Sequence, residues 1–180
     1  MPQTMLAVLS MVVTTLFAFN QHRNVLSSRL NMVREDMAIR STGVAVDVLE
    51  EIGSMSFDEA TRDKVISSSS ELTAVQRLDI HNLTGGLENT QETSLESGGV
   101  NDLDDFNGAT IERSREVNGT NIGFRAESVV SYVDPTDNTT EVDYPTKLKK
   151  VTIKVYSLNI ARPDTIYLTQ LHACGSRCGW

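Results

Sequence analysis

The chain reads MLAVLSMVVTTLFAF from Met5 to Phe19. These fifteen residues include no charge, no glycine and no proline, and only Ser10, Thr14 and Thr15 are polar. A bilayer core takes about 20 apolar residues, whereas runs of about 10–14 are typical of core helices and signal-peptide cores. The run lies between these classes. Its helix therefore has to be covered by lipid, by the rest of the chain or by identical helices.

Three environments could bury this helix. It could be an uncleaved membrane anchor in lipid, a core helix of an ordinary soluble domain, or one helix in a bundle of copies of itself. A cleaved secretory signal is disfavoured, because no Lys or Arg precedes the run and the polar residues 20–23 follow it instead of a small-residue cleavage site. We favour the bundle, since a head-to-tail arrangement of copies propagates into a filament. The side chains expected to form this assembly surface are Met5, Leu6, Val8, Leu9, Val12, Val13, Leu16, Phe17 and Phe19.

Helical periodicity continues beyond the apolar run. No Gly or Pro occurs between Gln3 and Thr42, and apolar residues further along recur at steps of three or four, as on one stripe of a helix. Gly43 is expected to bend this helix and Gly53 to end it. A helix from Gln3 to Ile52 would be about 75 Å long, which is too long for a compact domain, so its apolar half should project. The stripe consists of Leu26, Leu30, Val33, Met37, Val44, Val48, Ile52 and Met55.

The last third of the chain has the alternating pattern of β-strands. Strands are predicted over residues 123–133, 149–156 and 165–171, whereas residues 84–86 and 92–99 have the composition of loops. Regular structure is expected to return near Ala109. The side chains predicted to face the core are Phe124, Ala126, Ser128, Val130, Tyr132, Val151, Ile153 and Val155.

These elements predict an α+β fold, in which a long N-terminal helix packs against a C-terminal antiparallel sheet. The helix occupies residues 1–53, with an assembly or membrane segment at 1–22 and an amphipathic half at 23–53. A loop-rich β-sheet head occupies residues 54–180. The chain has 24 acidic and 16 basic residues and a net charge of −8. This acidic balance argues against nucleic acid as the main partner.

Three stretches resemble, in this order, segments of the type IV pilins and of the pseudopilins of type II secretion. GSMSFDE at 53–59 resembles the helix exit of minor pilins, and NDLDDFNG at 101–108 resembles an acidic segment common in that group. Residues 147–155 and 166–169 resemble its paired C-terminal strands. The family usually has a glutamate at the fifth residue, where this chain has Met5, but archaeal pilins and archaellins often lack it. No leader with a cleavage glycine is visible, as expected for an already processed chain.

The resemblance implies a structural subunit of an extracellular type IV pilus-like helical filament at the cell surface. Its partners would be copies of itself, the inner-membrane pilus assembly machinery, and the membrane that holds the helix before assembly. The alternative is a membrane-anchored extracytoplasmic binding module with a β-rich head. No enzymatic activity and no cofactor are expected, because His22, His81 and His172 lie in unrelated contexts, with His172 placed after the last strand.

The acidic residues Asp102, Asp104 and Asp105 are candidate ligands of a metal ion, since Ca²⁺ takes several carboxylate and carbonyl oxygens. Their spacing does not match the EF-hand loop. The favoured interpretation is a solvated loop, and a turn-capping role for one Asp is compatible with either interpretation.

Cys174 and Cys178 enclose three residues near the C-terminus. In an exported chain they most simply form one small disulfide loop. Free thiols and a metal site with His172 are the alternatives.

Asn82, Asn118 and Asn138 each begin an Asn-x-Thr sequence and are candidate glycosylation sites. Such matches occur by chance in a chain rich in Asn and Thr. The plainer interpretation is that they lie in surface loops.

Overall fold

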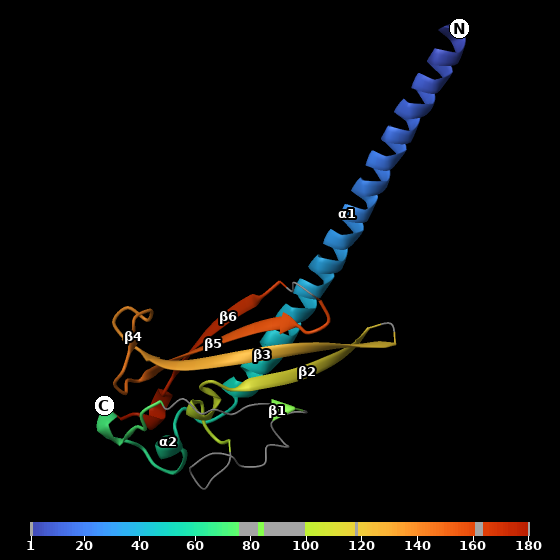
Figure 1. Cartoon of the computed structure of the whole chain (residues 1–180). Helices are drawn as coiled ribbons and strands as arrows, with labels where there is room; N and C mark the ends of the chain where they lie inside the picture. Colours follow the sequence, from blue (N-terminus) through green and yellow to red (C-terminus); the bar gives the residue numbers. More distant parts are fainter. Residues whose placement is uncertain (1, 76–82, 85–99, 118, 161–163, 180) are drawn as a thin grey trace. The chain divides into compact units, whose positions relative to one another are not determined.

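The computed structural model describes residues 2–75, 83–84, 100–117, 119–160 and 164–179. A long helix and a mainly antiparallel sheet confirm the predicted α+β class (Figure 1). The helices are α1 (Pro2–Gly53) and α2 (Glu59–Asp63), with single 3₁₀ turns η1 (Ser69–Glu71), η3 (Asp104–Phe106) and η4 (Gly175–Arg177). The strands are β1 (Leu83–Thr84), β2 (Thr110–Val117), β3 (Thr120–Val133), β4 (Glu141–Val142), β5 (Leu148–Ser157) and β6 (Ile166–Ala173).

The chain forms two compact units, Met1–Met37 and Ala38–Trp180. The boundary lies inside α1, so the last turns of this helix belong to the same unit as the sheet. We call the second unit the head. The first unit consists of helix alone among its described residues.

The helix α1 is continuous from Pro2 to Gly53, and its end at Gly53 is the one predicted. Gly43 does not interrupt it. Within the head, the buried positions follow one stripe at steps of three and four, as an amphipathic helix requires. These positions are Ser41, Val44, Ala45, Val48, Leu49 and Ile52. The earlier stripe residues Leu26, Leu30 and Val33 are exposed.

The sheet has the strand order β1-β2-β3-β5-β6, and β4 also pairs with β3. All these pairings are antiparallel except that of β1 with β2. Gly119 lies between β2 and β3 with a φ of 77°, a conformation that glycine adopts without a steric penalty. The strand β2 begins at Thr110, close to the predicted return of structure at Ala109.

The predicted alternation of β3 and β5 is confirmed. Ala126 pairs with Val155, and Val130 pairs with Val151, so the buried residues of the two strands share one face. Tyr132 continues this face on β3, and its partner on β5 is Lys149. The side chain of Lys149 is therefore directed into the core, although the sequence analysis did not include it there.

The strand β6 is longer than predicted. It runs to Ala173 and therefore contains His172, which the sequence analysis placed after the last strand. That placement was wrong because pairing with β5 continues to the end of the strand, where His172 is opposite Lys149 and Ala173 is opposite Leu148.

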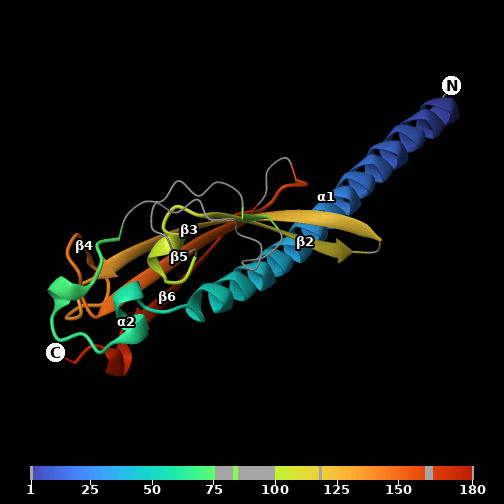
Figure 2. The same cartoon turned by 90° about the horizontal axis from the view of Figure 1, so that it is seen from below.

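The head part of α1 lies along one face of the sheet (Figure 2). Two ion pairs tie it to β2: Arg113 with Glu51, at 2.5 Å, and Arg115 with Asp47. A second apolar cluster fills the space between the sheet and the segment after α1. Its buried members are Ile66, Leu72, Tyr132, Cys174 and Cys178.

Candidate functional site

The assembly surface predicted on α1 is open to solvent along its whole length. All residues from Met5 to Phe19 are exposed, and the nine large side chains named above range from 49% exposed at Val12 to 77% at Met5. Exposed apolar patches larger than a few hundred Å² are rare on soluble monomers and mark interaction or membrane surfaces. This segment is the candidate functional site.

The two threonine hydroxyls inside this segment are satisfied by the helix itself. The Thr14 hydroxyl donates to the carbonyl of Ser10 at 2.8 Å, and the Thr15 hydroxyl donates to the carbonyl of Met11 at 2.7 Å. A Ser or Thr bonded in this way exposes no unpaired donor to an apolar medium. The segment can therefore enter lipid or a packed bundle without leaving these hydroxyls unpaired.

By length and composition, α1 is able to cross a membrane. Membrane anchors and signal sequences share this property, and so do core helices of soluble proteins. In a core helix the apolar window is mostly buried, whereas 0% of this window is buried. The exposure disfavours the alternative of an ordinary soluble core helix.

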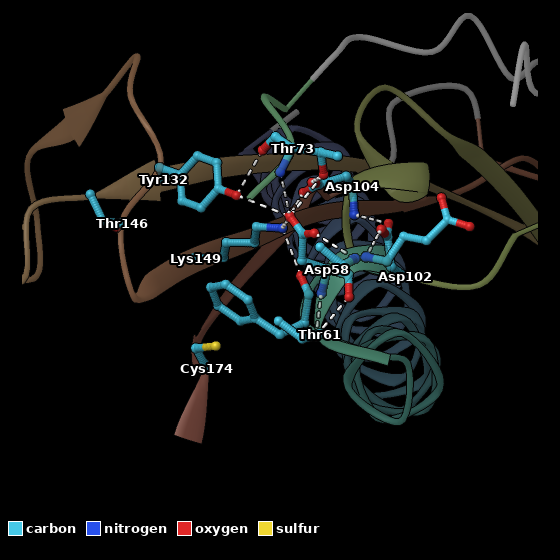
Figure 3. A network of polar contacts seen from close by, with 12 residues as sticks. Asp58, Thr61, Thr73, Asp102, Asp104, Tyr132, Thr146, Lys149 and Cys174 are labelled. Atoms are coloured by element: carbon cyan, nitrogen blue, oxygen red, sulfur yellow. Dashed lines mark hydrogen bonds and ion pairs between the residues drawn. The ribbon is translucent and has the colours of Figure 1, made fainter. Parts of the chain in front are cut away.

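The head contains a second unusual feature, a fully buried lysine (Figure 3). The Lys149 ammonium lies 2.7 Å from Asp104 Oδ1, 3.5 Å from Asp58 Oδ2 and 2.6 Å from the carbonyl oxygen of Phe57. It also lies 4.6 Å and 4.9 Å from the ring centroids of Phe57 and Tyr132. Three acceptors and two aromatic faces thus surround the three N–H donors of one ammonium.

Asp58 joins this lysine to the segment that leaves α1. It is the N-cap of α2, where its carboxylate accepts from the amide of Ala60, and it forms a capping box with Thr61. Its other oxygen, Oδ2, accepts from the amide and the hydroxyl of Thr73, at 2.9 Å and 2.8 Å. One buried carboxylate therefore holds two separate stretches of chain, residues 58–61 and Thr73, against β5.

The acidic segment at 102–105 is part of the same network. Asp102 accepts the amide of Glu59 at 2.7 Å and the amide of Asp104 at 2.8 Å, which is the predicted turn-capping role. Burial raises the pKa of Asp102 to about 7, and the neighbouring carboxylates of Asp104 and Asp105 add to this shift. Burial also raises the pKa of Asp104, against the opposing effect of the Lys149 ammonium.

The predicted solvated loop is therefore wrong for Asp102 and Asp104, which are 5% and 8% exposed. Their oxygens point at backbone amides, at Thr73 and at Lys149 rather than at a shared cavity. Asp105 accepts the amide of Asn101. Within the described part of the chain, no group of three His, Cys, Asp or Glu side chains is placed to hold a metal ion.

The structure joins Cys174 and Cys178 by a disulfide, with their Cα atoms 5.7 Å apart. The thiols are therefore not available for the alternative metal site with His172. Both cysteines are buried in the cluster that includes Ile66, and Ile66 also forms a bridge with Cys178.

Of the three candidate glycosylation sites, Asn82 and Asn118 lie outside the described residues. Asn138 is exposed in the turn between β3 and β4, with a φ of 60°. The hydroxyl of Thr140, two residues later, donates to Asp137 at 2.5 Å. Asn138 lies on the surface, as both interpretations require, and its glycosylation stays a prediction.

The structure describes two of the three histidines, and they lie on different elements. His22 is exposed on α1, His81 lies outside the described residues, and His172 is on β6. Burial lowers the pKa of His172.

The sequence contained two signals for the buried network that the sequence analysis did not use. Lys149 lies two residues before Val151 on the same strand, so the alternation that places Val151, Ile153 and Val155 inward also places Lys149 inward. Asp58 stands three residues before Thr61, as an N-cap does in a capping box.

Comparisons with protein-family models, curated proteins and solved structures give no match to this chain. The kinship with type IV pilins thus stays a resemblance carried by the three stretches of sequence named above.

Proposed function

We propose that this protein is a structural subunit of an extracellular, type IV pilus-like helical filament and polymerises through the apolar segment of α1. The observation that carries the proposal is the exposure of every residue from Met5 to Phe19. Fifteen such residues present about 1,200 Å² of largely apolar surface, which at about 25 cal/mol per Å² favours burial by about 30 kcal/mol. This free energy is ample for driving the helices together.

The distribution of side chains around the helix supports a bundle with several neighbours. In the head part of α1 the buried side chains form one stripe, which suits a single partner surface. Between Met5 and Phe19 apolar side chains point in every direction, because consecutive residues such as Leu16 and Phe17 are both apolar. A helix of this kind has to be surrounded, by several sister helices in the filament and by lipid before assembly.

Electron microscopy of the purified full chain after detergent removal tests the proposal. We expect long fibres of uniform width from the wild type and none from Val12→Glu, which would bury a carboxylate among the bundled helices. The matched control is Val46→Glu, which puts the same charge on an exposed apolar position of the same helix within the head. Fibres from the control and the wild type, but not from Val12→Glu, would support polymerisation through the apolar segment.

The alternative, a membrane-anchored extracytoplasmic binding module, is favoured by the capacity of α1 to cross a membrane. It gives a different result in the same experiment. An anchor would keep the wild type in vesicles as single copies and give no fibres under any condition tested.

A further inference from the structure

Most of the described basic residues of the head are paired with carboxylates. Among the described residues from Ala38 onward, Arg62 and Arg177 have no ion pair or hydrogen bond through their side chains, and both are exposed. The basic residues with carboxylate partners are Lys64, Arg113, Arg115, Arg125, Lys149, Lys150 and Lys154.

The two unpaired arginines line the same pocket. It has a volume of about 300 Å³, and Arg62 comes from α2 while Arg177 comes from η4. None of its described lining residues is acidic, so nothing in its wall neutralises the guanidinium groups. Phe57 and Leu103 add apolar surface to an otherwise mostly polar lining.

His172 contributes a third group to this pocket. Its Nε2 is buried and has no hydrogen-bond partner among the described residues. Leaving a buried polar atom without a partner is unfavourable, and a ligand that supplies the missing partner would remove this cost. Because burial lowers its pKa, the imidazole is neutral at pH 7 and can donate one hydrogen bond from Nε2.

The end of α1 leaves room for this imidazole. A Cβ atom at Gly53 would lie 2.9 Å from Cε1 of His172, closer than non-bonded carbon atoms approach. Only glycine at this position therefore lets the ring occupy its present place. The helix end and β6 together fix the position of His172 beside the two arginines.

We propose that this pocket binds a small molecule bearing a carboxylate, no larger than a single sugar acid. The planar fork of a guanidinium matches a carboxylate with two parallel hydrogen bonds, and His172 offers a further donor. A volume of about 300 Å³ is at the lower end of the range for small-molecule pockets. Phe57 and Leu103 provide the apolar wall that a carbon skeleton needs. The inference does not depend on the filament.

Calorimetric titration of the full chain in a non-glycosidic neutral detergent tests the proposal, with glucuronate as the probe and glucose as its uncharged counterpart. We expect glucuronate to bind and glucose not to bind. Each of Arg62→Ala and Arg177→Ala should weaken binding about tenfold, which is the loss of one charge-assisted hydrogen bond or more. His172→Phe should weaken it by a smaller factor, because one neutral donor is lost.

Lys64→Ala is the matched control, since Lys64 is an exposed cation close to α2 that does not line the pocket. An equal loss of affinity in this variant would mean a general effect of charge and would overturn the proposal. Absence of glucuronate binding at millimolar concentration would also overturn it. Titration with inorganic phosphate distinguishes the anion class, and tighter binding of phosphate than of glucuronate would contradict the choice of a carboxylate.

Discussion

The two ends of α1 are both apolar, but they have opposite environments. The stripe from Ser41 to Ile52 is buried by the head, with Val48 and Ile52 at 0% exposure. The segment from Met5 to Phe19 has no such cover. The distribution of apolar side chains around the helix explains this difference. One stripe is covered by one surface of the same chain, whereas a helix that is apolar on all sides needs several neighbours.

The stability of the head should therefore depend on its own interior, and the proposed assembly should depend on the exposed segment. Substitutions in the two regions should therefore have separable effects. In the experiments below, unfolding of the head is followed in the full chain, in detergent, by urea titration of methyl NMR signals from Val151 and Ile153. Both of these residues are buried in the sheet core.

The largest effect is expected from Lys149→Met, which preserves most of the volume but removes the charge. Asp58 and Asp104 would then be left buried without their cation, and losing one partner of a buried ion pair costs about 3–5 kcal/mol. The control is Lys154→Met, on the same strand, where the ion pair with Glu127 has side chains 38% and 39% exposed. We expect the control to cost less than about 1 kcal/mol. Equal losses in both variants would show that the buried network contributes nothing special to stability.

The next prediction compares the effect of a truncation at each end of α1 on the stability of the head. Ile52→Ala creates a cavity in the head and should lower its free energy of unfolding by about 3 kcal/mol. Leu9→Ala, a truncation of similar size at a residue 61% exposed, should leave that free energy within about 0.5 kcal/mol of the wild type. If Leu9→Ala destabilised the head as much as Ile52→Ala, the apolar segment would be part of the head and the comparison would fail.

Much of this fold could be predicted from periodicity alone. The inward face of β3 and the inward residues of β5 follow from local patterns of apolar residues, and the end of α1 follows from the glycine at position 53. The burial of Asp102 and Asp104 could not be predicted in this way. Their burial depends on a lysine about 45 residues away in the chain. Acidic residues without a known partner are expected to be exposed to solvent.

The two candidate sites differ in the same way in how well the sequence predicts them. The assembly segment is visible in sequence because its composition is unusual. The pocket at Arg62, His172 and Arg177 is not, because its residues are far apart in the chain and each is ordinary in its own context. What distinguishes the two arginines is the lack of a carboxylate partner within the described head, and that is a property of the folded structure.

The last effect is a change of stability with pH, and it concerns the charge state of the buried network. Asp102 in the folded head keeps its proton up to about pH 7, whereas in the unfolded chain it loses the proton near pH 4. Between these values the folded state binds more protons, so the contribution of this group to stability is complete below pH 4 and is lost as the pH rises through 7. The slope is at most about 1.4 kcal/mol per pH unit.

Urea titrations between pH 4.5 and 7.5 measure this slope, which Asp102→Asn should flatten because an amide does not titrate. The control is Asp137→Asn. Hydrogen bonds from Thr140 and Thr139 lower the pKa of the exposed Asp137 to about 2, so it stays ionised throughout this range and its removal should leave the slope unchanged. A wild-type head whose stability is constant over the range would mean that the Asp102 carboxylate is ionised in the fold. The amides of Glu59 and Asp104 would then be sufficient to hold a further buried negative charge beside the carboxylates that Lys149 already faces.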